Sequence, residues 1–194
     1  MLTEFEYQYL RRNKRRFKMT QAEAAAELAA AGIPQLPAFI DFQTTFGGYS
    51  PDEDVTYGIV GLNDEGDGEP RWSEQDELQL VRCDLENRTQ IRLRLDQSGV
   101  LYYEFNPVAE SFESYIVFKA YCDQTLSPLQ WTFIDHERRA TKRFRSFFDN
   151  LDNAPHVRSA TDQYHSIHKN NQYFEISICG DRRLFVRPDL LRGA

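Results

Sequence analysis

Residues 90–105, QIRLRLDQSGVLYYEF, decide the fold class of this 194-residue chain. Polar and apolar side chains alternate from Gln90 to Leu95, as they do in a strand with one buried face. Asp96 to Gly99 has the composition of a hairpin turn, and Val100 to Phe105 returns as a second strand. The segment therefore predicts an antiparallel pair of strands.

Three helices are expected before this hairpin. Leu2, Phe5 and Tyr9 have the spacing of an amphipathic first helix. Thr20-Gln-Ala-Glu23 has the pattern of a capping box, and the Ala-rich run after it predicts a helix that ends at Gly32. Pro37 suits the first turn of a short helix over residues 38–46, which ends at Gly47-Gly48. The N-terminal half thus begins as helical structure.

Helices and strands follow the hairpin without regular alternation. Ser111 suits the N-cap of a helix, and a basic amphipathic helix is expected from His136 to Leu151. Two strands, Tyr173 to Cys179 and Arg183 to Arg187, are joined by a tight turn at Gly180-Asp181. We therefore expect an α+β fold, a mainly antiparallel β-sheet with helices packed around it.

Composition and cysteine usage indicate an intracellular protein. No apolar run reaches the roughly 18 residues that a membrane span needs, and residues 1–18 are too charged for a signal peptide. Cys83, Cys122 and Cys179 are odd in number, far apart and set among apolar residues, which favours buried reduced thiols. We expect a cytoplasmic protein that binds no membrane.

Charge is concentrated in one segment. The chain has a net charge of −7, whereas Asp52 to Glu86 alone has twelve acidic against two basic residues, a local charge of −10. This balance disfavours binding to nucleic acid. The basic helix expected at 136–151 has the composition of a nucleic-acid patch, but its phenylalanines share one face, so an ordinary amphipathic helix is favoured.

The sequence contains a few groups of residues that could serve catalysis or bind a cofactor, but each has a simpler interpretation. His165-x-x-His168 with Asp162 would bring two imidazoles and a carboxylate together on a helix, yet surface histidines are favoured over a metal site. The acidic residues of 52–86 are favoured as solvated groups, since acid–base catalysis needs a desolvated carboxyl with a raised pKa. We therefore expect no enzyme, no metal and no cofactor.

Two blocks of the sequence resemble the SUKH superfamily of bacterial proteins. Residues 22–48, AEAAAELAAAGIPQLPAFIDFQTTFGG, are similar to its acidic helix, Leu-Pro turn and short aromatic helix ending in Gly-Gly. Residues 99–103 and 108–116, GVLYY and VAESFESYI, are similar to a later strand and helix. The resemblance covers about residues 22–121 and implies an α+β fold there. From the chain length we expect one domain over 1–194, in which residues 1–18 are a helical extension and residues 123–194 are a helix and β-hairpin extension, neither of which has a counterpart in the family pattern.

The resemblance also implies a function. It suggests an immunity protein, without catalytic residues, that binds and neutralises a cognate bacterial toxin domain by covering its active site or substrate cleft. The acidic segment and the aromatic residues near it are the expected contact surface, because a basic cleft attracts such a segment and buried aromatics dominate interface energies. The expected partner-binding residues are Tyr49, Asp52, Glu53, Asp54, Tyr57, Asp64, Glu65, Asp67, Glu69 and Trp72.

Two other functions stay open at this point. The first is a regulatory or scaffold module that binds a host protein without any toxin, a role that the resemblance also includes. The second is a metal-dependent enzyme that uses His165, His168 and acidic partners.

Overall fold

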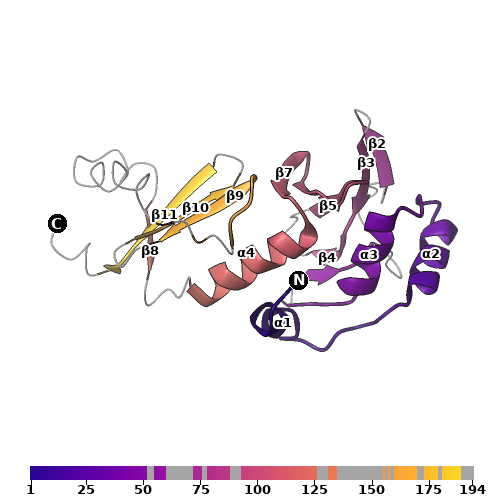
Figure 1. Ribbon diagram of the computed structural model, residues 1–194, viewed down its shortest axis with the longest axis horizontal. Helices are drawn as coiled ribbons and strands as arrows, with labels where there is room; N and C mark the ends of the chain where they lie inside the picture. The colour runs from indigo at the N-terminus through magenta and orange to yellow at the C-terminus, as the bar shows by residue number, and fades with distance from the viewer. Residues whose placement is uncertain are drawn as a thin grey trace. The chain divides into compact units, whose positions relative to one another are not determined.

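The chain folds into two compact units, Met1–Ile116 and Val117–Ala194 (Figure 1). The computed structural model describes residues 1–51, 55–59, 72–75, 78–87, 93–125, 131–134, 155, 157, 160–169, 173–178 and 181–188. The boundary between the units lies within one helix, α4 (Phe112–Thr125).

The first unit, which we call unit 1, carries helices before its sheets. Five antiparallel strands form a sheet in the order β2-β3-β5-β6-β7, and β1 pairs with β4 in a separate antiparallel ribbon. Helices α2 and α3 lie side by side (Figure 1). The elements are α1 (Glu4–Leu10), α2 (Gln21–Ala30), α3 (Pro37–Thr45), β1 (Val55–Tyr57), β2 (Trp72–Gln75), β3 (Leu78–Arg82), β4 (Asp84–Asn87), β5 (Leu93–Leu95), β6 (Leu101–Tyr103) and β7 (Asn106–Ala109).

The second unit, unit 2, combines the later part of α4 with a four-stranded antiparallel sheet. The strand order is β8-β11-β10-β9. Its strands are β8 (Thr132–Ile134), β9 (His165–Lys169), β10 (Tyr173–Ile178) and β11 (Asp181–Val186). The protein is therefore an α+β fold with mainly antiparallel sheets, as its sequence predicts; the basic helix expected at 136–151 lies outside the described residues.

Local sequence rules account for α2. The Glu23 N–H donates to Thr20 Oγ1 at 3.3 Å, and the Thr20 N–H donates to Glu23 Oε2 at 2.8 Å, which completes the capping box. Hydrogen bonds from Thr20 also lower the pKa of the Glu23 carboxyl. Gly32, with φ of +69°, follows the last turn, so both predicted ends of this helix are confirmed.

The end of α3 is closed by the N-terminal segment. Arg15 donates from Nε to the carbonyl oxygen of Gly47 at 2.9 Å and from Nη2 to that of Thr44 at 3.0 Å. These bonds satisfy carbonyl groups that a helix leaves without partners, and a cation is favoured at this end of the helix dipole. Residues 15–17 run so close to Gly48 that a Cβ there would lie 2.2 Å from the Phe17 carbonyl oxygen.

An aromatic cluster forms the core of unit 1. The ring of Phe112 lies 4.7 Å from Phe42, 4.8 Å from Phe46 and 4.8 Å from Tyr57, measured between centroids. The contacts with Phe42 and Tyr57 are edge-to-face, the arrangement that the ring quadrupole favours. Phe112 therefore joins the start of α4 to α3 and β1.

The predicted hairpin turn is built around Asp96. Its Oδ1 accepts hydrogen bonds from the N–H groups of Ser98 and Val100, at 2.8 and 2.9 Å, and its Oδ2 accepts from the Tyr102 hydroxyl at 3.2 Å. Gly99 takes φ of +93°, which L-residues with side chains adopt at a cost. The sequence thus specified both the turn and the pairing of β5 with β6.

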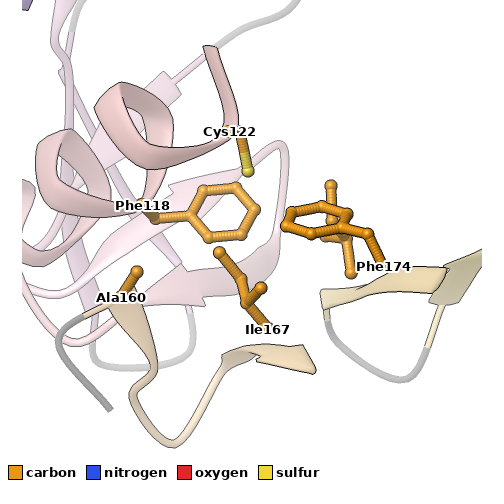
Figure 2. Close-up of a cluster of buried hydrophobic side chains, with 6 residues drawn as sticks. Phe118, Cys122, Ala160, Ile167 and Phe174 are labelled. Carbon is orange, nitrogen blue, oxygen red and sulfur yellow. The ribbon is translucent and has the colours of Figure 1, made fainter. Parts of the chain in front are cut away.

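Unit 2 has its own apolar core on one face of its sheet. Figure 2 shows Phe118 and Cys122 of α4 directed at Ile167 of β9 and Phe174 of β10, with Ala160 beside them. Each fully buried Ile or Phe contributes about 1.5–3 kcal/mol of transfer free energy. This cluster therefore fixes the α4 side chains of unit 2 against its strands.

Two of the three cysteines are buried free thiols, as the sequence indicated: Cys83 and Cys122. Burial raises the pKa of the Cys122 thiol to about 12 and that of Cys83 well above its ordinary value. Both side chains therefore stay protonated at neutral pH and act as apolar core groups. Cys179 lies outside the described residues.

Among the described residues, none of the helices has both the length and the apolar character required to cross a bilayer.

The Gly48 backbone yields a first prediction. Gly48→Ala is expected to cost more than about 2 kcal/mol of unfolding free energy, because the left-handed φ and the backbone of Phe17 both oppose a Cβ. Gly32→Ala is the matched control, since Gly32 also has positive φ but meets no atom within 4 Å, and about 1 kcal/mol is expected there. Urea unfolding of both variants measures the difference; equal losses would contradict the steric explanation.

Candidate protein-binding surface

The structure describes three of the ten residues expected to bind a partner: Tyr49, Tyr57 and Trp72. The other seven lie outside the described residues: Asp52, Glu53, Asp54, Asp64, Glu65, Asp67 and Glu69. Their role stays a prediction from the sequence.

The sequence suggested that the two tyrosines are exposed, but the structure shows that both are buried. Tyr49 is 8% exposed and lies under the guanidinium of Arg15, 4.3 Å from its ring centroid, whereas Tyr57 is 1% exposed and packs on Phe112. Both rings stabilise the core of unit 1, so they are not available as anchors for a partner. Trp72, at the start of β2, is partly exposed.

Exposed aromatic side chains are found instead in the turn between β6 and β7. Tyr103 is 39% exposed and Phe105 is 56% exposed. Among the described residues, the large apolar side chains that are exposed are Met1, Tyr103, Phe105 and Phe133, and two of these lie in this one turn. Adjacent exposed aromatics are a feature of protein-binding sites, because such rings supply most of the energy at the centre of an interface.

The backbone of this turn is strained. Tyr103 pairs with Asn106, so Glu104 and Phe105 form a two-residue loop, and Glu104 has φ of +55°. Hairpins of this kind normally have Gly where φ is positive, and a residue with a Cβ pays about 1–2 kcal/mol. Strain of this kind is often concentrated at functional positions.

Arg94 of β5 holds the Phe105 ring in place. Its guanidinium carbon lies 5.1 Å from the ring centroid, within the range of a cation–π contact. Arg94 Nη1 also donates to Ser73 Oγ of β2 at 3.4 Å. The exposed ring is therefore oriented by neighbouring strands of the sheet before any partner arrives.

The turn shares one end of the five-stranded sheet with the start of β2. The register aligns Trp72, Val81, Leu95, Leu101 and Ala109 in one row across the five strands. Strands are spaced by about 4.8 Å, so Trp72 and Leu101 are about 14 Å apart, and the turn begins two residues beyond Leu101. Trp72, the first residue of β2, therefore lies at the same end of the sheet as Tyr103 and Phe105.

A buried carboxyl also lies in unit 1. Burial raises the pKa of Asp84 to about 6, although the Arg82 guanidinium, with Nε 3.1 Å from Oδ1, acts in the opposite direction. The sequence favoured solvated carboxylates throughout 52–86, and for Asp84 that interpretation is wrong. The Asp84 side chain is inaccessible to solvent, so its carboxyl group does not face a surface where a substrate could reach it.

The histidines of unit 2 do not form the constellation considered from the sequence. His165 and His168 lie on strand β9 and not on a helix, so their side chains, three residues apart, point to opposite faces of the sheet. Asp162 does approach His165, with Oδ1 3.1 Å from Nδ1, in a buried pair beside Phe118. The described residues contain no group of three or more His, Cys, Asp or Glu placed to hold a metal ion.

The chain matches no protein-family model, no curated protein and no solved structure. Evidence for a function therefore comes from the geometry of the described residues and from the resemblance of residues 22–48, 99–103 and 108–116.

Sequence reasoning missed the turn at Glu104-Phe105 for a physical reason. The strand was expected to continue from Val100 to Phe105, whereas β6 ends at Tyr103. Neither turn residue is Gly, Asn or Pro, so the usual composition of a turn is lacking. Asn106-Pro107 was the available signal, because proline in a sheet is confined to edge strands such as β7.

The buried Asp84 predicts an unusual pH dependence. The folded state holds this proton more tightly than the unfolded chain, whose carboxyl has the ordinary pKa of 3.8. Protonation of Asp84 therefore stabilises the folded state fully below about pH 4, and this stabilisation of about 3 kcal/mol is lost as the pH rises through about 6. Relative to Asp84→Asn, the unfolding free energy of the wild-type protein should fall by about 3 kcal/mol between pH 4 and pH 7.

Urea unfolding of both proteins across this range is the measurement. Asp41→Asn, which changes an exposed carboxylate on α3, is the control and should not alter the profile of the wild-type protein. Parallel profiles for wild type and Asp84→Asn would contradict the prediction.

The strained turn predicts a substitution that does no harm to folding. Glu104→Gly should leave thermal stability unchanged or raise the unfolding free energy by up to about 1 kcal/mol, because glycine accepts the positive φ without steric cost. Gly99→Ala, in the neighbouring hairpin turn, should have the opposite effect, because Gly99 has φ of +93° and an added Cβ would meet only the Ala38 Cβ at 3.9 Å. A clear loss of stability in Glu104→Gly would mean that the Glu104 side chain, and not strain, determines the turn.

Proposed function

We propose that this chain is a bacterial immunity protein that binds and neutralises a cognate toxin domain by covering its active site or substrate cleft. The observation that supports this function most directly is the contact between the two sequence blocks that resemble the SUKH superfamily. Phe42 and Phe46 come from the first block and Phe112 from the second, and their rings meet at 4.7 and 4.8 Å. A domain of the SUKH pattern requires that these two blocks pack into one hydrophobic core.

The charge distribution along the sequence supports binding as the mode of action. The segment from Asp52 to Glu86 has a formal charge of −10 in a chain of net charge −7. A toxin domain that acts on nucleotides or nucleic acids needs a basic cleft, and an acidic partner is steered to such a cleft at an increased association rate. Occupying the cleft with carboxylates also excludes the anionic substrate.

Growth rescue tests this function. Co-expression of this chain with the product of the adjacent gene is expected to restore growth of a host that the adjacent gene product alone arrests. Failure to rescue growth, with both proteins produced and folded, would overturn the immunity role. Rescue would also separate this role from a regulatory module, which has no reason to protect the host.

The acidic segment predicts a change in association kinetics. Asp64→Lys with Glu65→Lys should lower the association rate with the adjacent gene product about tenfold at low salt, and the difference should narrow as salt screens the charges. Glu27→Lys with Asp41→Lys is the control, because it changes the net charge equally at exposed positions on α2 and α3. Stopped-flow or surface-plasmon measurements give both rates; equal effects would show that net charge alone matters.

A further inference from the structure

We infer that the β6–β7 turn, defined by Tyr103, Glu104, Phe105 and Asn106, is the anchor of a docking surface for a protein that has an apolar pocket with a basic rim. This inference rests on the proposed function and names the kind of site that the toxin domain must offer. It moves the centre of the interface from the buried Tyr49 and Tyr57 to this turn.

The turn exposes a large apolar area. Tyr103 and Phe105, two residues apart at the tip of one hairpin, are 39% and 56% exposed. Water contact with this much aromatic surface is unfavourable, and insertion into a pocket removes it. A convex tip fits a concave pocket, so the partner must supply the cavity.

The turn and the Phe105 side chain are ordered before a partner binds. The Arg94 guanidinium stacks on Phe105 at 5.1 Å, and the two-residue loop is tied at both ends by the pairing of Tyr103 with Asn106. A side chain that is already ordered loses little conformational entropy on binding, which increases its contribution to affinity. The strained φ of Glu104 is consistent with a turn kept for recognition.

Charge complementarity indicates the character of the partner. Glu104 is exposed and lies between Tyr103 and Phe105 in the sequence, and β2 begins with Trp72 at the same end of the sheet as the turn. Trp72 and the turn are separated by about 14 Å across the strands, which is less than the width of a standard interface of about 800 Å² per partner. One partner can therefore contact the turn and Trp72, and a basic rim around its apolar pocket complements the acidic Glu104.

The test compares two exposed aromatic positions. Phe105→Ala with Tyr103→Ala is the test variant, and Phe133→Ala is the matched control, because Phe133 is 50% exposed and belongs to unit 2. The probe is the purified product of the adjacent gene, and calorimetric titration gives its Kd with each protein. Far-UV circular dichroism and thermal unfolding establish that all variants are folded.

The expected result is a Kd at least about 30-fold weaker for the double variant and unchanged within about twofold for Phe133→Ala. Glu104→Lys should lower the association rate and flatten its dependence on salt, since it reverses a charge at the rim. Arg94→Gln should weaken binding by a smaller factor, because Phe105 is then no longer held.

Binding and growth rescue together distinguish failure of this inference from failure of the immunity function. If the wild-type chain rescues growth and the double variant binds as tightly as wild type, the docking surface is wrong and the immunity function stands. If the wild-type chain binds through this turn but does not rescue growth, the docking surface stands and the immunity function is wrong. If the wild-type chain does not bind the adjacent gene product at all, both are wrong.

Discussion

Unit 1 depends on the burial of one aromatic ring, that of Phe112. It contacts Phe42 and Phe46 on α3 and Tyr57 on β1, so three elements from distant parts of the sequence meet at a single side chain. Interiors are packed as densely as organic crystals, and a ring of this size leaves no freedom for α3 to shift. Everything that α3 positions therefore depends on this contact.

The N-terminal segment secures the same helix from the other side. Arg15 caps the carbonyl groups at the end of α3, and the chain at Phe17 passes against Gly48. Gln43 is buried, and its Oε1 accepts a hydrogen bond from the N–H of Ile59 at 2.8 Å. Polar groups taken out of water in this way need partners, and here the backbone supplies them. Residues 1–18 are thus an integral part of unit 1.

A rigid sheet with a strained, aromatic turn is a suitable scaffold for recognition. The buried row of Val81, Leu95, Leu101 and Ala109 fixes the strands, while Phe105 and Tyr103 project beyond it into solvent. The buried row stabilises the sheet, and the turn provides the surface for binding, so stability and binding depend on different residues. The buried Asp84 illustrates the opposite case, a polar group that costs stability when it is ionised.

The sequence by itself determined the features that depend on neighbours along the chain: the Thr20 capping box, the glycines after α2 and α3, the Asp96 turn and the α+β class. Tertiary structure decided which aromatic rings are buried and which are exposed, because burial depends on residues far away in sequence. Tyr57 and Phe105 both lie in aromatic-rich segments. Tyr57 is buried because Phe112 packs on its ring, whereas Phe105 is exposed because it lies in a strained turn. The same reason applies to His165 and His168. Their spacing of three residues predicted one face of a helix, but they belong to strand β9, which pairs with β10, and their side chains therefore lie on opposite faces of the sheet.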